Sequence, residues 1–351
     1  MALALATLAH AQQPRLFTDS RPAMGTIFTI HLYAPDARQA SAHFDAAFDE
    51  VERIEEALSN YRPSSELSRI NRDAAVVSVT TDPEVFALLQ RSLDFSRRSD
   101  GAFDITVGPL MRAWGFFRGQ GSYPSAEALA AARSKVGWQL VALDPAARTV
   151  RFARRGVELD PGGIGKGYAV DRAAALLRES GVTAALIDAG GSTLYAIGTP
   201  PGKAGWLVHI SQPERREAVV SDVLLRDESL STSGNYEKFF RLGGRMYCHI
   251  MDPRTGEPVQ GMMQTTVIAP SATDSDALST ATFVMGRERG AALLKTIPGA
   301  RALFITGDAG SEHSTAFYSF RWPTEAGLPW RASGPAVSSN ERKHAGRTQP
   351  Q

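Results

Sequence analysis

Cysteine, net charge and long apolar runs are all scarce in this chain. Cys248 is the single cysteine among 351 residues, which excludes an internal disulfide, a zinc site built from several thiolates and a CxxC redox pair. The formal net charge of +1 indicates no broad surface for nucleic acid or for a charged membrane. No stretch after residue 11 reaches the roughly 18 apolar residues that a membrane-spanning helix needs. We therefore expect no nucleic-acid partner, and we expect any bound metal to be held by oxygen atoms.

The N-terminus lacks the positive residues that open an export signal, although residues 1–11 resemble the end of one. They are uncharged and rich in Ala and Leu, and they close with Ala9-His10-Ala11, which fits an A-x-A cleavage site. A signal shortened by a misplaced start codon and a frayed terminus both explain this pattern. We expect residues 1–19 to be a truncated signal peptide with an N-terminal lead, and the protein to be periplasmic. Without a cysteine after the cleavage site, a lipoprotein is not expected.

Helix and strand patterns alternate irregularly along the rest of the chain. Apolar residues recur at helical spacing from Phe44 to Leu58, after a strand pattern at 27–32, and Asp82-Pro83 marks the start of a second helix. Further patterns predict a helix from Ser125, helices at about 166–180, 273–285 and 287–296, and strands at 148–152, 184–188, 205–210, 264–269 and 301–306. This mixture predicts an α+β fold. We expect one catalytic unit over 20–323 and a disordered tail over 324–351, which is rich in Pro, Gly, Ser and charge.

A glycine-rich segment from Asp160 to Asp171 opens the helix predicted at 166–180. Glycines 162, 163, 165 and 167 allow close approach of the backbone to a ligand, and a helix N-terminus presents unpaired N–H groups to an anion such as a phosphate. The segment is not a Walker loop, because Gly167 follows Lys166, and it does not match the dinucleotide fingerprint G-x-G-x-x-G. A tight helix entry without a ligand remains the alternative, with Asp171 as an ordinary helix acid.

Two further segments carry side chains suited to catalysis. Asp276 and Thr280 are four residues apart at a predicted helix start and share a face, where a carboxylate and a hydroxyl suit Mg²⁺; helix capping and a buried threonine are the alternative. His249 stands at a strand end before the turn Asp252-Pro-Arg-Thr-Gly256, where it could accept the proton of a hydroxyl or simply be a hydrogen-bonded structural residue. Asp252 could orient His249 or only cap the turn.

Aromatic residues also occur on predicted loops. Tyr61 follows the helix that ends at Leu58, and Phe103 and Trp114 lie in the run Gly101 to Phe116. Exposed rings on loops can stack on a planar ligand, although buried rings are ordinarily core. These aromatic residues indicate a ligand site only in combination with the other segments.

The combination and order of these segments resembles the FAD:protein FMN transferases of the ApbE-type flavin transferase family. The resemblance runs from about Ala23 to Gly286. Its seven blocks are Ala23-Met-Gly-Thr26, Ser59 to Asn71, Phe103 to Leu110 with Trp114-Gly-Phe116, Asp160 to Asp171, Ser231 to Tyr236, His249 to Gly256 and Asp276 to Thr280. The resemblance implies an ApbE-type, T-fold-like fold with mixed sheets packed with helices.

The resemblance also implies an activity and a set of site residues. Family members use Mg²⁺ to cleave FAD, release AMP and attach FMN through a phosphoester to Thr or Ser of a target flavoprotein, often a membrane-bound redox subunit. By position, the FAD contacts are Met24, Tyr61, Ala102, Phe103, Asp104, Gly162, Tyr168 and Met251, with Tyr61 on the flavin ring. The metal ligands are Asp276, Thr280 and the carbonyl of Gly165, and the catalytic residues are His249 and Asp252.

Two departures and two alternative functions accompany the resemblance. Ser279 stands where some relatives carry an additional Asp, and Asp188 stands where many have Asn. An FAD pyrophosphatase would use the same residues with water in place of the acceptor hydroxyl. A flavin carrier without chemistry would need the glycines and Tyr61, but not Asp276, Thr280 or His249.

Overall fold

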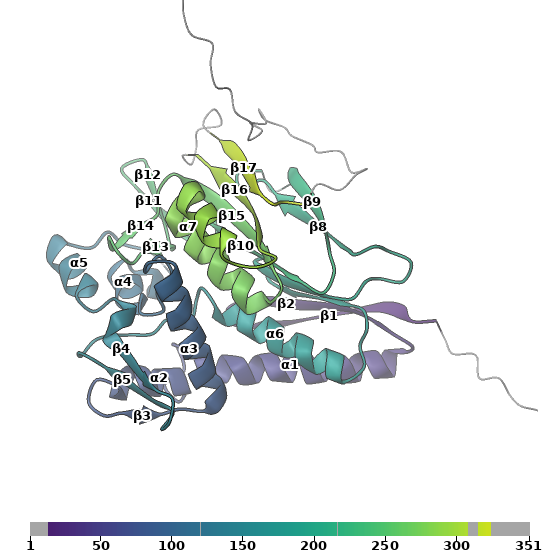
Figure 1. Ribbon diagram of the computed structural model, residues 1–351, viewed down its shortest axis with the longest axis horizontal. Coiled ribbons are helices and arrows are strands. Elements are labelled where there is room, and N and C mark those ends of the chain that lie inside the picture. Colours follow the sequence, from purple (N-terminus) through teal and green to yellow (C-terminus); the bar gives the residue numbers. More distant parts are fainter. Residues whose placement is uncertain (1–12, 120, 216, 308–314, 324–351) are drawn as a thin grey trace, which may run out of the picture.

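An eight-stranded antiparallel sheet lies at the centre of the fold (Figure 1). The computed structural model describes residues 13–119, 121–215, 217–307 and 315–323. In their order across the sheet, the strands are β1 (Arg15–Ala23), β2 (Thr26–Ala34), β6 (Ala185–Ala189), β7 (Thr193–Ile197), β10 (Ser229–Gly234), β15 (Met262–Ala269), β16 (Arg301–Thr306) and β17 (Ala316–Phe320). All neighbouring pairs are antiparallel.

Three long helices cover one face of this sheet. They are α1 (Ala37–Leu58), α6 (Gly165–Glu179) and α7 (Ala272–Lys295). The apolar stripe of α1 is buried as its spacing predicts, and the Asp36 side chain caps the helix by accepting from the N–H of Gln39. Gly286 interrupts α7 with a φ of 74°, so the two helices predicted at 273–285 and 287–296 are the two halves of one kinked element.

The opposite face is covered by a hairpin of β8 (Trp206–Ser211) and β9 (Val219–Leu225), which encloses a second apolar core. Trp206 and Val223 from this hairpin pack with Leu230 and Ile268 from the central sheet. The indole N–H of Trp322 donates to the Ser221 hydroxyl at 2.9 Å and ties the end of the sheet to the hairpin. The central strands are therefore buried on both faces, and every residue of β15 is buried.

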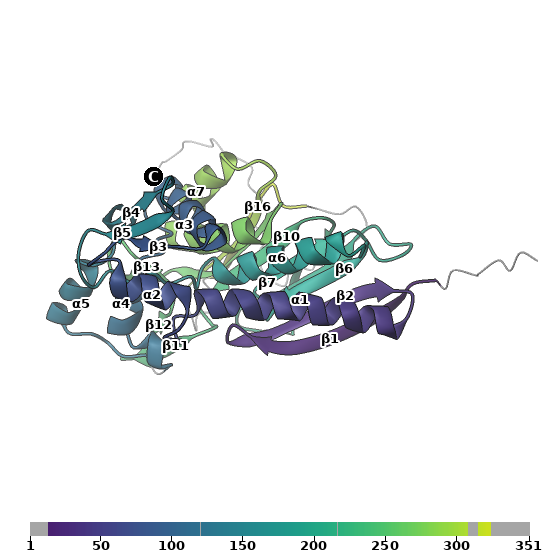
Figure 2. The same ribbon diagram turned by 90° about the horizontal axis from the view of Figure 1, so that it is seen from below.

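The remaining elements gather at the C-terminal end of α1 (Figures 1 and 2). The helices are α2 (Glu66–Asp73), α3 (Pro83–Arg98), α4 (Gly108–Ala113) and α5 (Ala126–Arg133), with 3-10 turns η1 (Phe116–Arg118) and η2 (Trp138–Leu140). A small sheet has the order β3 (Val79–Thr80), β5 (Thr149–Phe152), β4 (Val141–Asp144). Two further hairpins are β11 (Phe239–Leu242) with β12 (Arg245–Cys248), and β13 (Met251–Asp252) with β14 (Glu257–Pro258).

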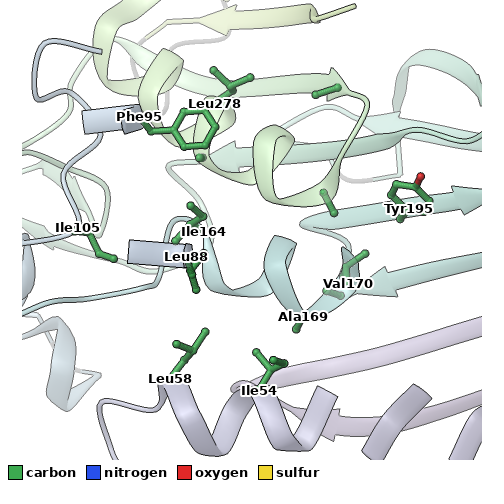
Figure 3. Close-up of a cluster of buried hydrophobic side chains, with 14 of the residues drawn as sticks. Ile54, Leu58, Leu88, Phe95, Ile105, Ile164, Ala169, Val170, Tyr195 and Leu278 are labelled. Carbon is green, nitrogen blue, oxygen red and sulfur yellow. The ribbon is translucent and has the colours of Figure 1, made fainter. Parts of the chain in front are cut away.

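A single apolar core joins these elements to the central layers. In Figure 3, Ile54 and Leu58 of α1 point toward Leu88 of α3 and Ala169 of α6, and Leu278 of α7 closes the cluster from the other side. All five side chains are at most 3% exposed. The core therefore holds the beginning of α6 and of α7 against a common support, and the candidate site is built on these two helix starts.

The predicted α+β fold is confirmed, although several of its elements were not predicted. Strand β1 was not predicted, and because it begins at Arg15 the folded part starts before the expected boundary at residue 20. Strands β7, β10 and β17 of the central sheet were also missed, as were helices α2 and α4. The predicted signal segment at 1–12 and the predicted tail at 324–351 lie outside the described residues. In the described ranges, none of the helices has the length and apolar composition to span a membrane.

Candidate active site

A cavity of about 560 Å³ opens where the starts of α6 and α7 meet the loops that follow α1, α3 and β10. Its wall contains all of the predicted site residues except Tyr168 and Asp252. These lining residues are Met24, Tyr61, Ala102, Phe103, Asp104, Gly162, Gly165, His249, Met251, Asp276 and Thr280. Segments separated by more than two hundred residues in the sequence thus converge on one space.

The close approach of α6 to α7 depends on Gly167. A Cβ at this position would lie 2.7 Å from Cβ of Asp276 and closer still to the carbonyl oxygen of Ala272. The N–H of Gly167 donates to Oδ2 of Asp276 at 2.9 Å. Asp171, one turn later on α6, accepts from the N–H groups of Ala272 and Thr273 at 2.7 and 2.9 Å. Asp171 is therefore a cap for α7, not a solvated acid.

Asp276 and Thr280 present two oxygen ligands one turn apart on α7. Burial raises the pKa of Asp276, and the neighbouring charge of Lys166 opposes that effect. In the described part of the chain, no hydrogen bond engages the second carboxylate oxygen, Oδ1. A carboxylate, a hydroxyl and a main-chain carbonyl are the hard oxygen donors that suit Mg²⁺, which completes its shell with water and phosphate.

The glycine that faces the Thr280 hydroxyl is Gly163. A Cβ there would lie 3.1 Å from Oγ1 of Thr280, whereas one on Gly165 would meet Pro161 and Met24. Gly165 is the first residue of α6, and a helical carbonyl in that place pairs with the N–H four residues later. Gly163 precedes the helix and was not among the predicted metal ligands. Within the described ranges, no group of three or more His, Cys, Asp or Glu side chains is assembled to hold a metal, so hydroxyl and main-chain oxygens would have to contribute.

A ladder of buried hydroxyls fixes α7 on β10. Ser275 Oγ lies 2.8 Å from Ser229 Oγ and 2.7 Å from Ser231 Oγ. At the cavity end, Ser233 Oγ lies 2.9 Å from Ser279 Oγ and 3.4 Å from Oγ1 of Thr280. Alternate residues of a strand share a face, so these serines meet one side of α7. Ser279 is fully buried in this ladder, which explains how the chain accommodates a neutral residue beside Thr280.

His249 lines the cavity as a neutral imidazole. Its Nδ1 lies 3.2 Å from the carbonyl oxygen of Lys238, and because a carbonyl only accepts, Nδ1 carries the proton and the lone pair is on Nε2. Burial, followed by the positive charges of Lys238 and Lys166, lowers the pKa of His249 from 6.5 to about 4. The ring of Phe116 lies 6.4 Å from the imidazole. At pH 7 the histidine can therefore accept a proton at Nε2.

Aromatic rings stand at the mouth of the cavity. Tyr61 is 72% exposed, and its ring centroid lies 5.4 Å from that of Phe117. Asn71 supports this loop, because its side chain exchanges hydrogen bonds of 2.7 and 3.0 Å with the backbone of Leu159 and donates to Oδ1 of Asn60 at 3.3 Å. An exposed ring on a braced loop can stack on a planar ligand.

The family can now be assigned from comparison with known proteins. A model of the ApbE family matches residues 24–304. The chain belongs to the ApbE family. The FAD:protein FMN transferase of Treponema pallidum is 34% identical over 312 residues, which cover 84% of this chain and 85% of the relative. The FAD:protein FMN transferase of Klebsiella pneumoniae is 32% identical over 295 residues, which cover 83% and 90%.

Solved ApbE structures share the fold. The apo form of the Pseudomonas stutzeri flavinyl transferase ApbE has a TM-score of 0.77 and 31% identity, and the match covers 88% of this chain and 96% of that one. The ApbE protein of Thermotoga maritima has a TM-score of 0.76 and 32% identity, with 83% and 94% covered. The predicted family and the predicted α+β fold are confirmed, whereas the sheets, predicted to be mixed, are antiparallel in the described residues.

Two predicted site residues of this ApbE family member lie elsewhere. The Tyr168 hydroxyl donates to Oε1 of Glu84 at 2.7 Å, so its side chain is turned toward α3 and away from the cavity. Asp252 accepts from Nε and Nη2 of Arg254 at 2.8 and 2.7 Å, because the tight turn brings the guanidinium back onto it. Asp252 therefore does not pair with His249 as predicted. It has the alternative role instead and caps the turn, because its Oδ1 also accepts from the N–H of Arg254 at 3.0 Å.

Asp104 lies in the wall of the cavity, but both oxygens of its carboxylate accept hydrogen bonds from the protein itself. Oδ1 accepts from N–H and hydroxyl of Thr106 at 2.9 and 2.7 Å, and Oδ2 accepts from the N–H of Trp138 at 2.7 Å. A ligand would therefore meet the main chain at 102–104 and not this carboxylate. Burial raises the pKa of Asp104, and the Thr106 and Trp138 bonds oppose it.

Several lining residues were not among the predicted site residues. They include Asn60, Asp160, Gly163, Lys166, Ser233, Glu237 and Lys238. Asp160 and Lys166 belong to the glycine-rich segment, and Asp160 accepts from the N–H of Gly162 at 2.8 Å, which orders the turn before α6. A cation beside an anion-binding turn was a signal available in the sequence. Lys238, by contrast, is brought to the cavity by a strand pairing that the sequence does not reveal.

Proposed function

We propose that this protein is an FAD:protein FMN transferase that joins the FMN half of FAD to a Thr or Ser hydroxyl of a target flavoprotein and releases AMP. The relatives named above are called FAD:protein FMN transferases. The observation that supports it most is the cavity itself, which brings a neutral histidine, a pair of hard oxygen ligands and a glycine-rich helix start into one space. A flavin-binding carrier that catalyses no reaction would need only the glycine-rich helix start.

We infer that FAD lies along the cavity with its ring system at the mouth. The exposed Tyr61 would stack on the isoalloxazine, whose planar surface matches an aromatic ring. The start of α6 offers backbone N–H groups to the pyrophosphate, and Lys166 adds a positive charge. Met24, held by a bond of 2.9 Å from its N–H to Oε2 of Glu55, borders the same space.

Magnesium is part of the proposal. Asp276, Thr280 and a carbonyl of the 163–165 segment would hold it, and when bound it would supply charge neutralisation at the pyrophosphate. The fit rests on the hard oxygen character of all three donors and on the unengaged Oδ1 of Asp276.

We assign His249 as the base that takes the proton from the acceptor hydroxyl. The acceptor oxygen forms a bond to the FMN phosphorus, the phosphorus–oxygen bond to AMP breaks, and the proton of the hydroxyl passes to Nε2 of His249. The Lys238 carbonyl keeps Nδ1 protonated and so keeps the lone pair on Nε2. The negative pyrophosphate would offset the charges of Lys238 and Lys166, so the pKa of His249 rises when substrate binds and its basicity increases.

A combined assay of acceptor mass and AMP release tests this proposal. Purified protein is incubated with FAD, Mg²⁺ and a soluble flavin-acceptor domain that bears a Thr. We expect a mass gain equal to FMN with stoichiometric AMP, both abolished by EDTA and by Asp276→Asn. Asp274→Asn is the matched control, because Asp274 lies on the same helix but pairs with Arg91 at 2.7 Å outside the cavity. AMP without modified acceptor would favour the pyrophosphatase, and neither product would leave a flavin-binding protein.

The target protein and the compartment are also proposals. We infer a periplasmic enzyme that modifies a redox flavoprotein, including membrane-bound subunits, on the basis of Ala9-His10-Ala11 and the family relationship. Expression of the gene with its upstream coding region, followed by cell fractionation, would test export. Retention in the cytoplasm with an unprocessed N-terminus would contradict it.

A further inference from the structure

The hairpin of β11 and β12 borders the cavity and is held in place by its inner face. Lys238 precedes β11, His249 follows β12, and both line the cavity. The rings of Phe240 and Tyr247 are stacked 5.1 Å apart, and both contact Trp114, at 6.3 and 5.7 Å between centroids. Figures 1 and 2 place the hairpin beside α4, at one margin of the molecule. One side of the hairpin is thus anchored, and the strands have a fixed position relative to His249.

The backbone of β11 has one paired edge and one open edge. In an antiparallel pair, alternate residues direct both N–H and C=O toward the partner strand. The N–H of His249 donates to the carbonyl of Lys238 at 2.9 Å, and the register continues from there, so Phe240 and Leu242 also face β12. Phe239 and Arg241 must then direct their N–H and C=O groups outward. In the part of the chain that the structure describes, no hydrogen bond reaches these outward groups.

The two edges of the hairpin differ. On the β12 side, Nε2 of Gln260 donates to the carbonyl of Met246 at 3.2 Å and covers part of the edge. On the β11 side, the edge is bare, and the side chains of Phe239 and Leu242 are 44% and 52% exposed. A bare edge with apolar side chains is a template for an added strand, and natural proteins ordinarily blunt such edges unless they are used.

We propose that the outer edge of β11 docks the acceptor flavoprotein, by pairing with an extended segment of it next to the Thr or Ser that receives FMN. This inference rests on the proposed function, which requires a polypeptide hydroxyl to reach His249. A strand advances about 3.3 Å per residue, so a segment paired with Phe239 and Arg241 ends one or two residues from Lys238 and the cavity. Main-chain pairing needs no particular side chains, which suits an enzyme whose acceptor residue is either Thr or Ser.

The test compares Arg241→Pro with Arg241→Ala in the full-length protein. Proline removes the outward N–H and puts a ring at the edge, while the inward bonds to β12 are kept, and alanine removes only the side chain. We expect Arg241→Pro to raise the KM for a soluble Thr-bearing acceptor domain on the order of tenfold, the loss of one or two hydrogen bonds. The KM for FAD, the kcat at saturating acceptor and the melting temperature stay unchanged, and Arg241→Ala changes the acceptor KM less than about threefold.

Hydrogen exchange provides a second measurement that does not depend on catalysis. The probe is the same acceptor domain with its Thr replaced by Ala, added to the enzyme with FAD and Mg²⁺. We expect slower exchange of the amides in 239–242, and no slowing in Arg241→Pro. An unchanged acceptor KM in Arg241→Pro, or unprotected amides with bound acceptor, would overturn the docking proposal. Protection that appears without acceptor and grows with enzyme concentration would assign the edge to a second copy and overturn it as well. Failure of the wild type to modify any acceptor would instead contradict the transferase activity, since protection is measured separately.

Discussion

Replacement of Gly167 by alanine tests how α6 and α7 place the metal ligands. The new Cβ would lie 2.7 Å from Cβ of Asp276, and closer to the carbonyl oxygen of Ala272. Carbon atoms in contact ordinarily lie about 3.5–4.0 Å apart, so the helices must separate by roughly 1 Å. Overpacking of this kind costs about 1–3 kcal/mol, and the better helix propensity of alanine returns about 1 kcal/mol. We therefore expect the free energy of unfolding to fall by up to about 2 kcal/mol.

The same substitution should weaken magnesium dependence through geometry alone. Separation of the helices lengthens the bond of 2.9 Å from Gly167 N–H to Oδ2 of Asp276 and moves this carboxylate relative to the 163–165 segment. We expect the Mg²⁺ concentration for half-maximal AMP release to rise at least about tenfold, because Mg²⁺ demands near-ideal octahedral geometry. Gly165→Ala is the matched control: its Cβ would stay 3.3 Å from the nearest atom, in Pro161, and only small effects are expected. Chemical unfolding and Mg²⁺ titrations provide both numbers. If Gly167→Ala kept the wild-type free energy of unfolding and the wild-type Mg²⁺ dependence, Gly167 would not be what sets the spacing of α6 and α7.

Three further substitutions test other parts of the site. His249→Gln should reduce transfer by about 10²–10⁴-fold at pH 7. Its stability should also fall less steeply than that of the wild type between pH 6.5 and about 4, because the pKa of His249 is lowered in the folded state and protonation there favours unfolding; thermal melts at both pH values measure this. Ser275→Ala removes the hydroxyl shared by Ser229 and Ser231 and should cost about 1–2 kcal/mol in chemical unfolding, and an unchanged midpoint would show that the ladder does not stabilise α7. Tyr61→Ala should raise the KM for FAD by about two- to tenfold without changing the melting temperature, whereas Tyr61→Phe should retain wild-type affinity if stacking is the contact.

Local patterns in the sequence carried the prediction of helices α1, α3, α5, α6 and α7 and of strands β2, β5, β6, β8, β15 and β16. The apolar spacing from Phe44 to Leu58 predicts α1 because burial on one helix face depends only on intervals within the segment. The edge strand β1 was missed for the complementary reason. Its residues are exposed or half-buried and include Pro22, and only pairing with β2 makes this segment a strand.

The sequence by itself determined which chemistry is available: a glycine-rich helix start, a carboxylate and a hydroxyl at one-turn spacing, and a histidine at a strand end. These properties are set by residue type and by short intervals along the chain. The tertiary structure alone decided which of these groups are free to act. Asp104, Tyr168 and Asp252 are engaged by Thr106, Glu84 and Arg254, and Gly163 and Lys238 enter the site through neighbours distant in sequence. A hydrogen bond satisfies a polar group whatever the sequence distance of its partner, so only the folded arrangement distinguishes a structural carboxylate from a ligand.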